Sequence, residues 1–232
     1  RPKASVLAPD GSLWIAKFPS RDDEHDVGGW ELVAHRLAER AGITVAPSRG
    51  QRFASKHHTF LTHRFDRIGA ERLHFASAMT HLERVDGDSD GASYLELAEV
   101  LIRHGARASV DLEQLWRRIV FFVGVSNVDD HLRNHGFLLD ATGWRLAPAF
   151  DVNPVPWGDG LTLSISETDN AQDLDLVREV APFFRVAPAR ARVVIGEVVA
   201  AIRGWRAIAT EVGIARRALD AMAPAFRVAE AG

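Results

Sequence analysis

The chain has 232 residues, of which 47% are hydrophobic and 25% are charged, and its formal net charge is −3. This composition excludes a largely disordered chain, and the length suffices for one large domain or two modest lobes. The charge gives no overall nucleic-acid signature, although a local basic patch is compatible with it. The absence of Cys excludes disulfides and thiolate sites, and it fits a reducing compartment.

No apolar stretch approaches the roughly 20 residues that a membrane helix requires, and no secretory leader is visible. We therefore expect a cytoplasmic protein without direct membrane contact. The chain starts at Arg1-Pro2-Lys3 without an initiator Met, which indicates that the natural N-terminus lies upstream.

The first part of the chain is dominated by strand patterns. The turn Pro9-Asp10-Gly11-Ser12 separates two apolar stretches and predicts a β-hairpin, in which Lys17 continues an apolar face. Apolar residues at helical spacing follow, and Gly42 suits the position just after a helix. The expected elements are strands at 6–7 and 13–18, a helix at 30–41, strands at 43–45 and 59–62, and a charged stretch at 63–67.

The remainder is mostly helical. We expect a polar loop at 85–91, a helix at 94–102 closed by Gly105, and a helix that starts near Asp111 with Gln114 as its capping-box partner. The expected later elements are a hairpin of strands at 137–139 and 144–146, and helices from Asp173 onward, one of them starting at Pro188. The order predicts an α+β protein with a small strand-rich lobe, residues 1–66, and a helical lobe, residues 67–232.

The most informative stretch is the polar loop at 126–135, which follows an apolar run at 119–125. Polar groups held against a core are costly unless they are paired or bind something. Asp129 and Asn134 have the Asp-x-x-x-x-Asn spacing by which kinases place a base for the acceptor hydroxyl and an amide on Mg²⁺. Asp151, across the expected hairpin, supplies a second hard oxygen ligand. Alternatively, these carboxylates only cap nearby backbone amides.

Three charged residues extend this hypothesis. Lys17 suits a phosphate-binding lysine paired with Glu31 on the next helix, as in protein kinases. Alternatively, Lys17 is an edge lysine whose amine reaches water, and Glu31 is a solvated helix residue. Arg133 can neutralise charge on a γ-phosphate, or form an ion pair with Asp129 or Asp130.

Two other interpretations concern neighbouring residues. His131 and His135 have a spacing that can ligate zinc, so a metal-dependent hydrolase that uses Asp129, Asp130 and both histidines is an alternative. This His-x-x-x-His stretch lacks the Glu of the zincin motif, and imidazoles that support the loop by hydrogen bonds are the simpler reading. The stretch 63–67 links the two lobes, so its main chain can contact an adenine edge.

Four stretches, residues 15–19, 64–67, 127–137 and 144–151, resemble the HipA-like family of bacterial serine/threonine kinases, the toxin components of toxin–antitoxin pairs. The resemblance spans nearly the whole chain. Its specific part is the Asp-Asp-His-Leu-Arg-Asn block followed by Phe-Asp, whereas the lysine strand alone is not specific. The resemblance implies a two-lobed protein-kinase-like fold.

The resemblance also implies roles for individual residues. Lys17 corresponds to the ATP-phosphate lysine, Glu31 to its acidic partner, Asp129 to the catalytic aspartate and Asp151 to a metal aspartate. The other implied nucleotide contacts are the hinge residues His63, Arg64 and Phe65, the run His131, Leu132, Arg133 and Asn134 (Asn134 also on the metal), and Phe150. The family's Gly-rich phosphate loop and N-terminal subdomain should lie before Arg1.

The implied cofactors are ATP and Mg²⁺. The implied activity is transfer of the γ-phosphate to a protein Ser or Thr, for example on a translation component such as an aminoacyl-tRNA synthetase. The implied partner is a DNA-binding antitoxin. Besides the hydrolase, the alternative is an inactive kinase-like module that only binds the antitoxin.

Overall fold

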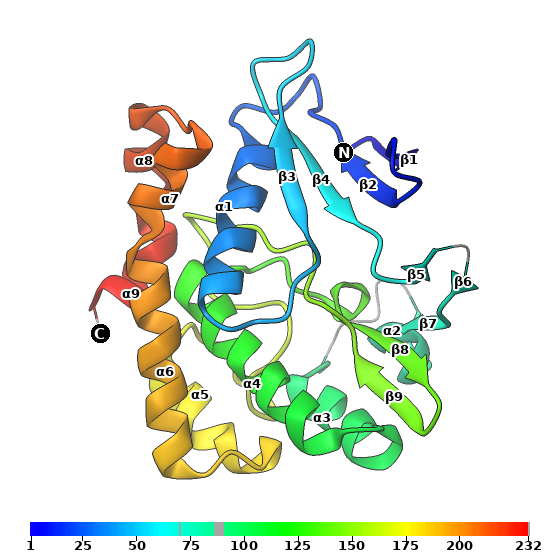
Figure 1. Cartoon of the computed structure of the whole chain (residues 1–232). Helices are drawn as coiled ribbons and strands as arrows, with labels where there is room; N and C mark the ends of the chain where they lie inside the picture. Colours follow the sequence, from blue (N-terminus) through cyan, green and yellow to red (C-terminus); the bar gives the residue numbers. More distant parts are fainter. Residues whose placement is uncertain (70, 86–90, 232) are drawn as a thin grey trace.

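The strand-rich lobe is an antiparallel sheet with one helix packed against it (Figure 1). The computed structural model describes residues 1–69, 71–85 and 91–231. The sheet has the order β1-β2-β4-β3, and its helix is α1. The elements are β1 (Lys3–Leu7), β2 (Leu13–Lys17), α1 (Val27–Arg40), β3 (Ser48–Gln51) and β4 (Thr59–His63).

The predicted hairpin is confirmed as β1 and β2, joined by a turn in which Gly11 has a φ of 82°. Strand β2 lies between β1 and β4, and its last residue, Lys17, pairs with Lys3 on one side and Phe60 on the other. Lys17 is only 8% exposed. The edge-lysine alternative is therefore wrong, because a central strand directs this side chain into the protein.

Helix α1 confirms the predicted helix and begins a turn earlier than expected. The side chain of Asp26 caps it by accepting a hydrogen bond from the backbone N of Gly29. Gly42, two residues after the helix ends, has a φ of 73°, as a residue just past a helix often does. The helix buries Trp30 and Glu31, neighbours in sequence that point to different parts of the protein.

Several short strands differ from expectation. Residues 43–45 form only an isolated bridge between Val45 and Ala149, whereas β3 lies a few residues later in a polar stretch. The next short strands along the chain are β5 (Arg67–Ile68), β6 (Glu71–Arg72) and β7 (Phe75–Ser77). Edge and two-residue strands bury little apolar surface, so the sequence carries no alternating pattern for them.

The helical lobe surrounds α4, whose residues from Ile119 to Val125 are almost fully buried. Its small sheet has the order β7-β8-β9, which confirms the second predicted hairpin. The elements are α2 (Ala78–His81), α3 (Tyr94–His104), α4 (Ala108–Val125), the 3₁₀ turn η1 (Leu132–Asn134), β8 (Gly136–Asp140), β9 (Gly143–Leu146), α5 (Leu174–Val180), the 3₁₀ turn η2 (Ala181–Phe184), α6 (Pro188–Arg203), α7 (Trp205–Val212), α8 (Arg216–Met222), the 3₁₀ turn η3 (Ala223–Phe226) and α9 (Arg227–Ala231).

The helix ends agree with the sequence except at α4. Gly105 ends α3, Asp173 caps α5, and Pro188 opens α6. Helix α4 begins three residues before Asp111, so the predicted capping box is wrong. Instead Asp111 accepts a hydrogen bond from the backbone N of Leu146, 3.1 Å away. Of the expected polar loop at 85–91, residues 86–90 lie outside the described part of the structure.

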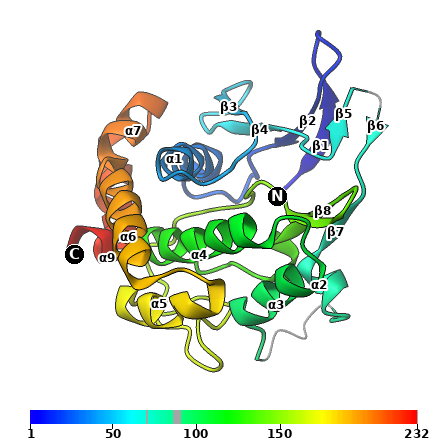
Figure 2. The same ribbon diagram turned by 60° about the horizontal axis from the view of Figure 1, so that its bottom comes forward.

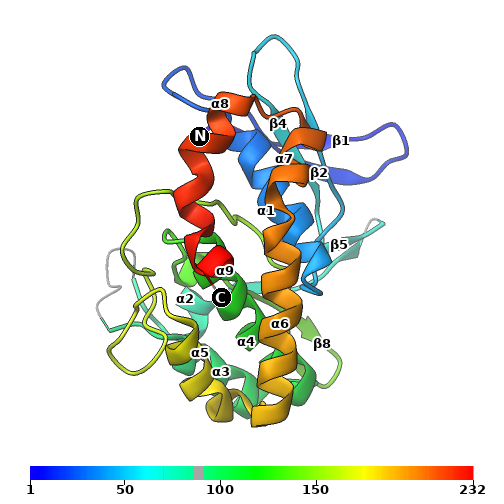
Figure 3. The ribbon, with the colours of Figure 1, turned by 90° about the vertical axis from the view of Figure 1, so that its left-hand side faces the viewer.

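The two lobes are in contact on the side away from β9. Figure 2 shows α1 end-on, with the sheet on one side and α6 and α7 on the other. Figure 3 shows the chain returning through α7, α8 and α9 alongside α1. Throughout the described ranges, the helices are too short or too polar to cross a membrane.

Two glycines test this packing in opposite directions. A Cβ on Gly28 in α1 would lie 2.2 Å from the backbone O of His58, whereas one on Gly196 in α6 would meet nothing within 4 Å. We expect Gly28→Ala to lower the free energy of unfolding by about 1–3 kcal/mol. The matched Gly196→Ala should raise it by about 0.5–1 kcal/mol through helix propensity. Urea titrations measure both, and equal effects would contradict the packing of α1 on the β3–β4 connection.

Candidate active site

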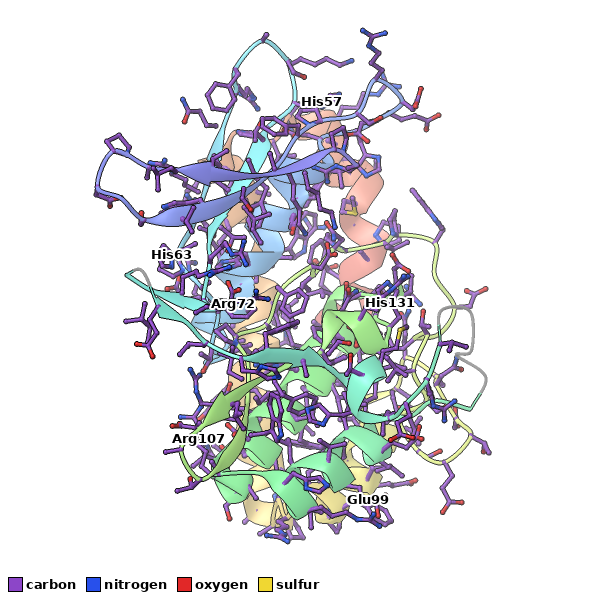
Figure 4. The ribbon with its side chains drawn as sticks, turned by 90° about the vertical axis from the view of Figure 1, so that its right-hand side faces the viewer. His57, His63, Arg72, Glu99, Arg107 and His131 are labelled. Atoms are coloured by element: carbon purple, nitrogen blue, oxygen red, sulfur yellow. The ribbon has the colours of Figure 1, made fainter. Side chains whose placement is uncertain are left out.

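A cavity of about 550 Å³ lies between the sheet and the helical lobe. Both lobes contribute to it: Lys17 and Glu31 come from β2 and α1, and Asn134 and Asp151 from the polar loop and the segment after β9. Figure 4 labels His63 and His131, which lie on opposite flanks of the region between the lobes. The predicted site residues that line the cavity are Lys17, Glu31, His63, Arg64, Phe65, His131, Arg133, Asn134, Phe150 and Asp151. Leu132 and Asp129 are not among its lining residues.

The ammonium of Lys17 lies between two carboxylates. Its Nζ is 2.5 Å from Oε1 of Glu31 and 2.5 Å from Oδ1 of Asp151. Burial lowers the pKa of Lys17, but the two carboxylates outweigh burial and the net pKa is raised. Burial raises the pKa of Glu31, whereas for Asp151 the effect of burial is overcome by Lys17 and the pKa is lowered. Lys17 therefore stays charged and connects the two lobes.

Asp151 adopts a backbone conformation that is uncommon for residues other than glycine. Its φ is 58°, in the left-handed region, and such strained residues concentrate at functional sites. The preceding Phe150 packs against Phe65, with ring centroids 5.7 Å apart, and near Phe75 at 6.4 Å. Phe75, which the sequence did not single out, also lines the cavity. This aromatic cluster fixes the segment that carries Asp151 next to the hinge.

In the stretch 63–65, which links the two lobes, several polar groups of His63 and Arg64 are hydrogen-bonded within the protein. The backbone N atoms of His63 and Arg64 donate to Pro47 and Leu13. The guanidinium of Arg64 donates twice to Asp66, at 2.9 and 2.6 Å, and the His63 ring lies against Trp14. The two backbone N–H groups and the guanidinium of Arg64 are thus already bonded within the protein, which leaves contact with a base to other groups of this stretch.

The polar loop is divided into a buried half and an exposed half. Oδ2 of Asp130 accepts hydrogen bonds from the hydroxyl of Tyr94 at 2.6 Å and pairs with Nε2 of His135 at 2.7 Å. All three residues are at most 1% exposed. Asp129 points away from this network and is exposed. This division supports structural roles for Asp130 and His135 and makes Asp129 the accessible carboxylate.

Asn134 is held by the same loop. Its Nδ2 donates to the backbone O of Asp129, 3.1 Å away, so its amide oxygen is the atom that can bind a cation. At the start of the loop, Oδ1 of Asn127 accepts from the backbone N of Asn153, 2.8 Å away. This bond ties the polar loop to the segment of Asp151. The two candidate metal ligands therefore belong to one connected unit.

The geometry is less suited to the zinc-hydrolase alternative. Asp130 and His135 are buried and bonded to each other, while Asp129 faces solvent. Within residues 1–69, 71–85 and 91–231, no group of three or more His, Asp or Glu side chains is arranged to hold a metal ion. His131 lines the cavity, and its buried Nδ1 has no hydrogen-bond partner in the part of the chain that the structure describes.

The cavity fits a nucleotide and a magnesium ion in its chemistry. Apolar side chains, including Ile15, Val45 and Val152, line part of it, and cations and carboxylates line another part. Asn134 and Asp151 offer the few hard oxygens that Mg²⁺ prefers alongside phosphates. The buried Oε2 of Glu31, for which the described residues provide no hydrogen-bond partner, is a further unsatisfied polar atom at this site.

Sequence reasoning missed two residues of the site region, and a signal existed for only one of them. Lys3 lines the cavity, with Nζ 3.9 Å from Oδ2 of Asp151. In the structure Lys3 lies opposite Lys17 across the hairpin, so extending the predicted first strand beyond residues 6–7 would have found it. Tyr94 is the only Tyr of the chain, but its partner Asp130 is 36 residues away, and no local pattern reports such a contact.

The Asp130 network predicts a stability effect. Tyr94→Phe removes the hydroxyl and leaves the buried carboxylate with one hydrogen bond fewer, so we expect the free energy of unfolding to fall by about 1–3 kcal/mol. Chemical denaturation of the variant and the parent protein measures it. An unchanged midpoint and slope would show that Asp130 does not depend on Tyr94.

The buried imidazole of His35, another residue that lines the cavity, should make the free energy of unfolding depend on pH. Burial lowers its pKa to about 4, from an unfolded value near 6.5. The stability associated with neutral His35 is complete above pH 6.5 and is lost as the pH falls toward 4, at up to about 1.4 kcal/mol per pH unit. We expect His35→Gln to flatten the stability–pH curve between pH 6.5 and 4.5. Parallel curves for the two proteins would contradict the burial of a neutral imidazole.

Comparisons with known proteins agree with this architecture. The family model "HipA-like C-terminal domain" matches residues 1–206. The protein named "Putative kinase Y4mE" of Sinorhizobium fredii (strain NBRC 101917 / NGR234) is 29% identical over 147 residues, which cover 60% of this chain and 33% of that relative.

Two solved structures share the fold. One is HipA of Shewanella oneidensis MR-1, in a complex with HipB and its operator DNA. It has a TM-score of 0.72 and 17% identity, and covers 99% of this chain and 62% of HipA. The other is the Helicobacter pylori proinflammatory kinase CtkA, with a TM-score of 0.59, 14% identity, and coverage of 99% and 93%. The chain thus spans about a third of its curated relative and less than two thirds of the HipA chain. On the family match, the two-lobed α+β fold and the interlobe cavity, the chain belongs to the HipA-like C-terminal domain family.

Proposed function

We propose that the chain is the catalytic region of an ATP-dependent kinase that phosphorylates a protein Ser or Thr. The observation that carries the proposal is the bonding of Lys17 to both Glu31 and Asp151 in a cavity that Asn134 also lines. Kinases use a lysine on a strand, a glutamate on a helix and a metal aspartate in this combination. The names of the relative Y4mE and of CtkA support the same class.

Each residue has a role in this proposal. Bound Mg-ATP supplies the γ-phosphoryl group and the cation that neutralises its charge. Lys17 and Lys3 orient the phosphates, and Asn134 and Asp151 hold the magnesium ion. Asp129 accepts the proton of the acceptor hydroxyl as the hydroxyl oxygen bonds to the γ-phosphorus and the bond from that phosphorus to the bridging oxygen of the departing ADP breaks.

The remaining cavity residues complete the proposed nucleotide contacts. The main chain at residues 63–65 contacts the adenine edge through groups other than the N–H of His63 and Arg64, with Phe65 beside Phe150 as an apolar wall. Arg133 adds positive charge near the transferred group, and His131 contacts the nucleotide through its ring. Leu132, which is buried in η1, supports the backbone of this run rather than the nucleotide directly.

The biological setting of the proposal follows from the relatives. The HipA neighbour was solved with HipB and operator DNA, and we propose that this protein likewise acts in the cytoplasm as the toxin of a toxin–antitoxin pair with a DNA-binding antitoxin. An acceptor among translation components, such as an aminoacyl-tRNA synthetase, is the corresponding proposal for the substrate.

Transfer of labelled phosphate tests the role of Asp129. In the full-length protein, Asp129→Asn removes the base, so we expect the rate of protein labelling from γ-labelled ATP to fall by about 10²–10⁴-fold. Asp140→Asn, at the exposed end of β8, is the matched control and should keep the parent rate. Labelling retained by Asp129→Asn would overturn the assignment of the base.

Thermal unfolding with and without Mg-ATP separates the proposal from an inactive scaffold. A ligand at 100 times its dissociation constant stabilises by about 2.7 kcal/mol, and Asp129→Asn should keep this stabilisation because Asp129 does not line the cavity. A full-length parent protein that shows no stabilisation would favour the binding-module alternative.

A further inference from the structure

The helix that carries Glu31 is packed on two sides. Trp30, 1% exposed, directs its ring toward Trp205 and Phe226, with centroids 6.1 and 6.3 Å away. Trp205 and Phe226 are themselves stacked at 4.3 Å and are fully buried. The residue next to Glu31 is therefore held in an aromatic cluster supplied by α7 and η3, which stand beside α1 in Figure 3.

The first turn of α1 is held by the same end of the chain. A Cβ on Gly29 would lie 2.7 Å from Cδ1 of Ile214, so the glycine lets Ile214 approach the helix closely. Nη2 of Arg52, between β3 and β4, donates to the backbone O of Gly213, 2.9 Å away. The connection between α7 and α8 thus contacts both α1 and the sheet.

The C-terminal turn also reaches the polar loop. The hydroxyl of Ser126 donates to the backbone O of Ala225, 2.9 Å away. Arg227 donates through Nη2 to the backbone O of Gly158 at 3.0 Å and to Oε1 of Gln172 at 2.8 Å. Ser126 is fully buried and lies three residues before Asp129.

Gly158 continues this connection toward Asp129. A Cβ at Gly158 would lie 2.3 Å from Cγ1 of Val128, so the backbone that accepts from Arg227 lies directly against the residue before Asp129. Residues 225–227 therefore make contacts in two directions within one turn. On one side they contact Trp30, the neighbour of Glu31, and on the other they contact Ser126 and Gly158, next to the polar loop.

We propose that residues 225–227 form a C-terminal clamp that positions Glu31 and Asp129 relative to each other. The catalytic consequence rests on the proposed function, whereas the positioning of Glu31 does not. The clamp lies beyond residue 206, where the family match ends. A displacement of about 1 Å at a catalytic constellation can cost on the order of 10²-fold in rate, so packing of this kind is sufficient to control activity.

The reactivity of Lys17 tests the clamp without any nucleotide. In the clamped protein Lys17 is buried and bonded to Glu31, so an amine-acylating reagent should modify it slowly relative to the exposed Lys56. In Phe226→Leu, α1 loses its support and Glu31 shifts from Lys17. The amine of Lys17 then loses a bonding partner and part of its cover, so the reagent reaches it more readily and we expect the Lys17-to-Lys56 modification ratio to rise on the order of tenfold.

The matched control is Phe184→Leu. Phe184 is also fully buried in a 3₁₀ turn, but it packs in the helical lobe near α4 and α5. Both variants lose the same atoms from a core, so a general loss of stability affects both. Mass spectrometry of the Lys17 peptide at a temperature where both variants are folded gives the ratio. An equal ratio in the two variants would overturn the proposal.

A variant of the exposed Arg227 tests the contacts of residues 225–227 with the polar loop, and it requires no substitution in the core. We expect Arg227→Ala to lower kcat for phosphoryl transfer with little change in the KM for ATP, because its contacts lead to the polar loop and not to Lys17. Arg217→Ala, exposed on α8, is its control. Equal kcat values for these two variants would overturn the clamp's role at Asp129. Absence of transfer in the parent protein would instead count against the proposed function and leave the Lys17 measurement decisive.

Discussion

The arrangement of the whole protein depends on one buried ammonium and its two carboxylates. Lys17 is nearly inaccessible to water, so its charge is tolerated only because Glu31 and Asp151 lie 2.5 Å away. One carboxylate comes from α1 and the other from the segment after β9. The sheet must therefore direct Lys17 inward, α1 must stay on the sheet, and the hairpin β8–β9 must return the chain to the cleft. These requirements bring the two lobes together around the cavity.

The polar loop that carries Asp129 also contains a buried charged group that needs partners. Its buried carboxylate, Asp130, is neutralised in part by hydrogen bonds from Tyr94 and His135, which anchor the loop to α3 and the core. The neighbouring carboxylate can then remain exposed without a partner in the core. Residues 225–227 contact both α1, on its side away from the sheet, and the start of the polar loop. The same contacts therefore stabilise the fold and position Glu31 and Asp129.

The sequence predicted those features that local chemistry determines. The Asp-Gly turn, the helical spacing from Trp30 and the apolar run of α4 gave the main elements, and the Asp129–Asn134 spacing directed attention to the site. Strand β3 was missed because Ser48–Gln51 is polar and lies at a sheet edge. Asp111 was misread as a cap because its partner, Leu146, is distant in sequence. Phe75 and Tyr94 join the site region through tertiary contacts that no local pattern encodes, whereas Lys3 was missed because the predicted first strand was too short to include it.

Magnesium dependence of ATP binding tests most directly whether the interlobe cavity is a kinase-type nucleotide site. Calorimetric titration of the full-length protein with ATP, with and without Mg²⁺, should show tighter binding with the metal. In Asp151→Asn the metal should add little, because one of the two proposed ligands has lost its charge. Binding of equal affinity with and without Mg²⁺ in the parent protein, or an undiminished metal effect in Asp151→Asn, would contradict the assignment of Asp151 and of the site built around Lys17.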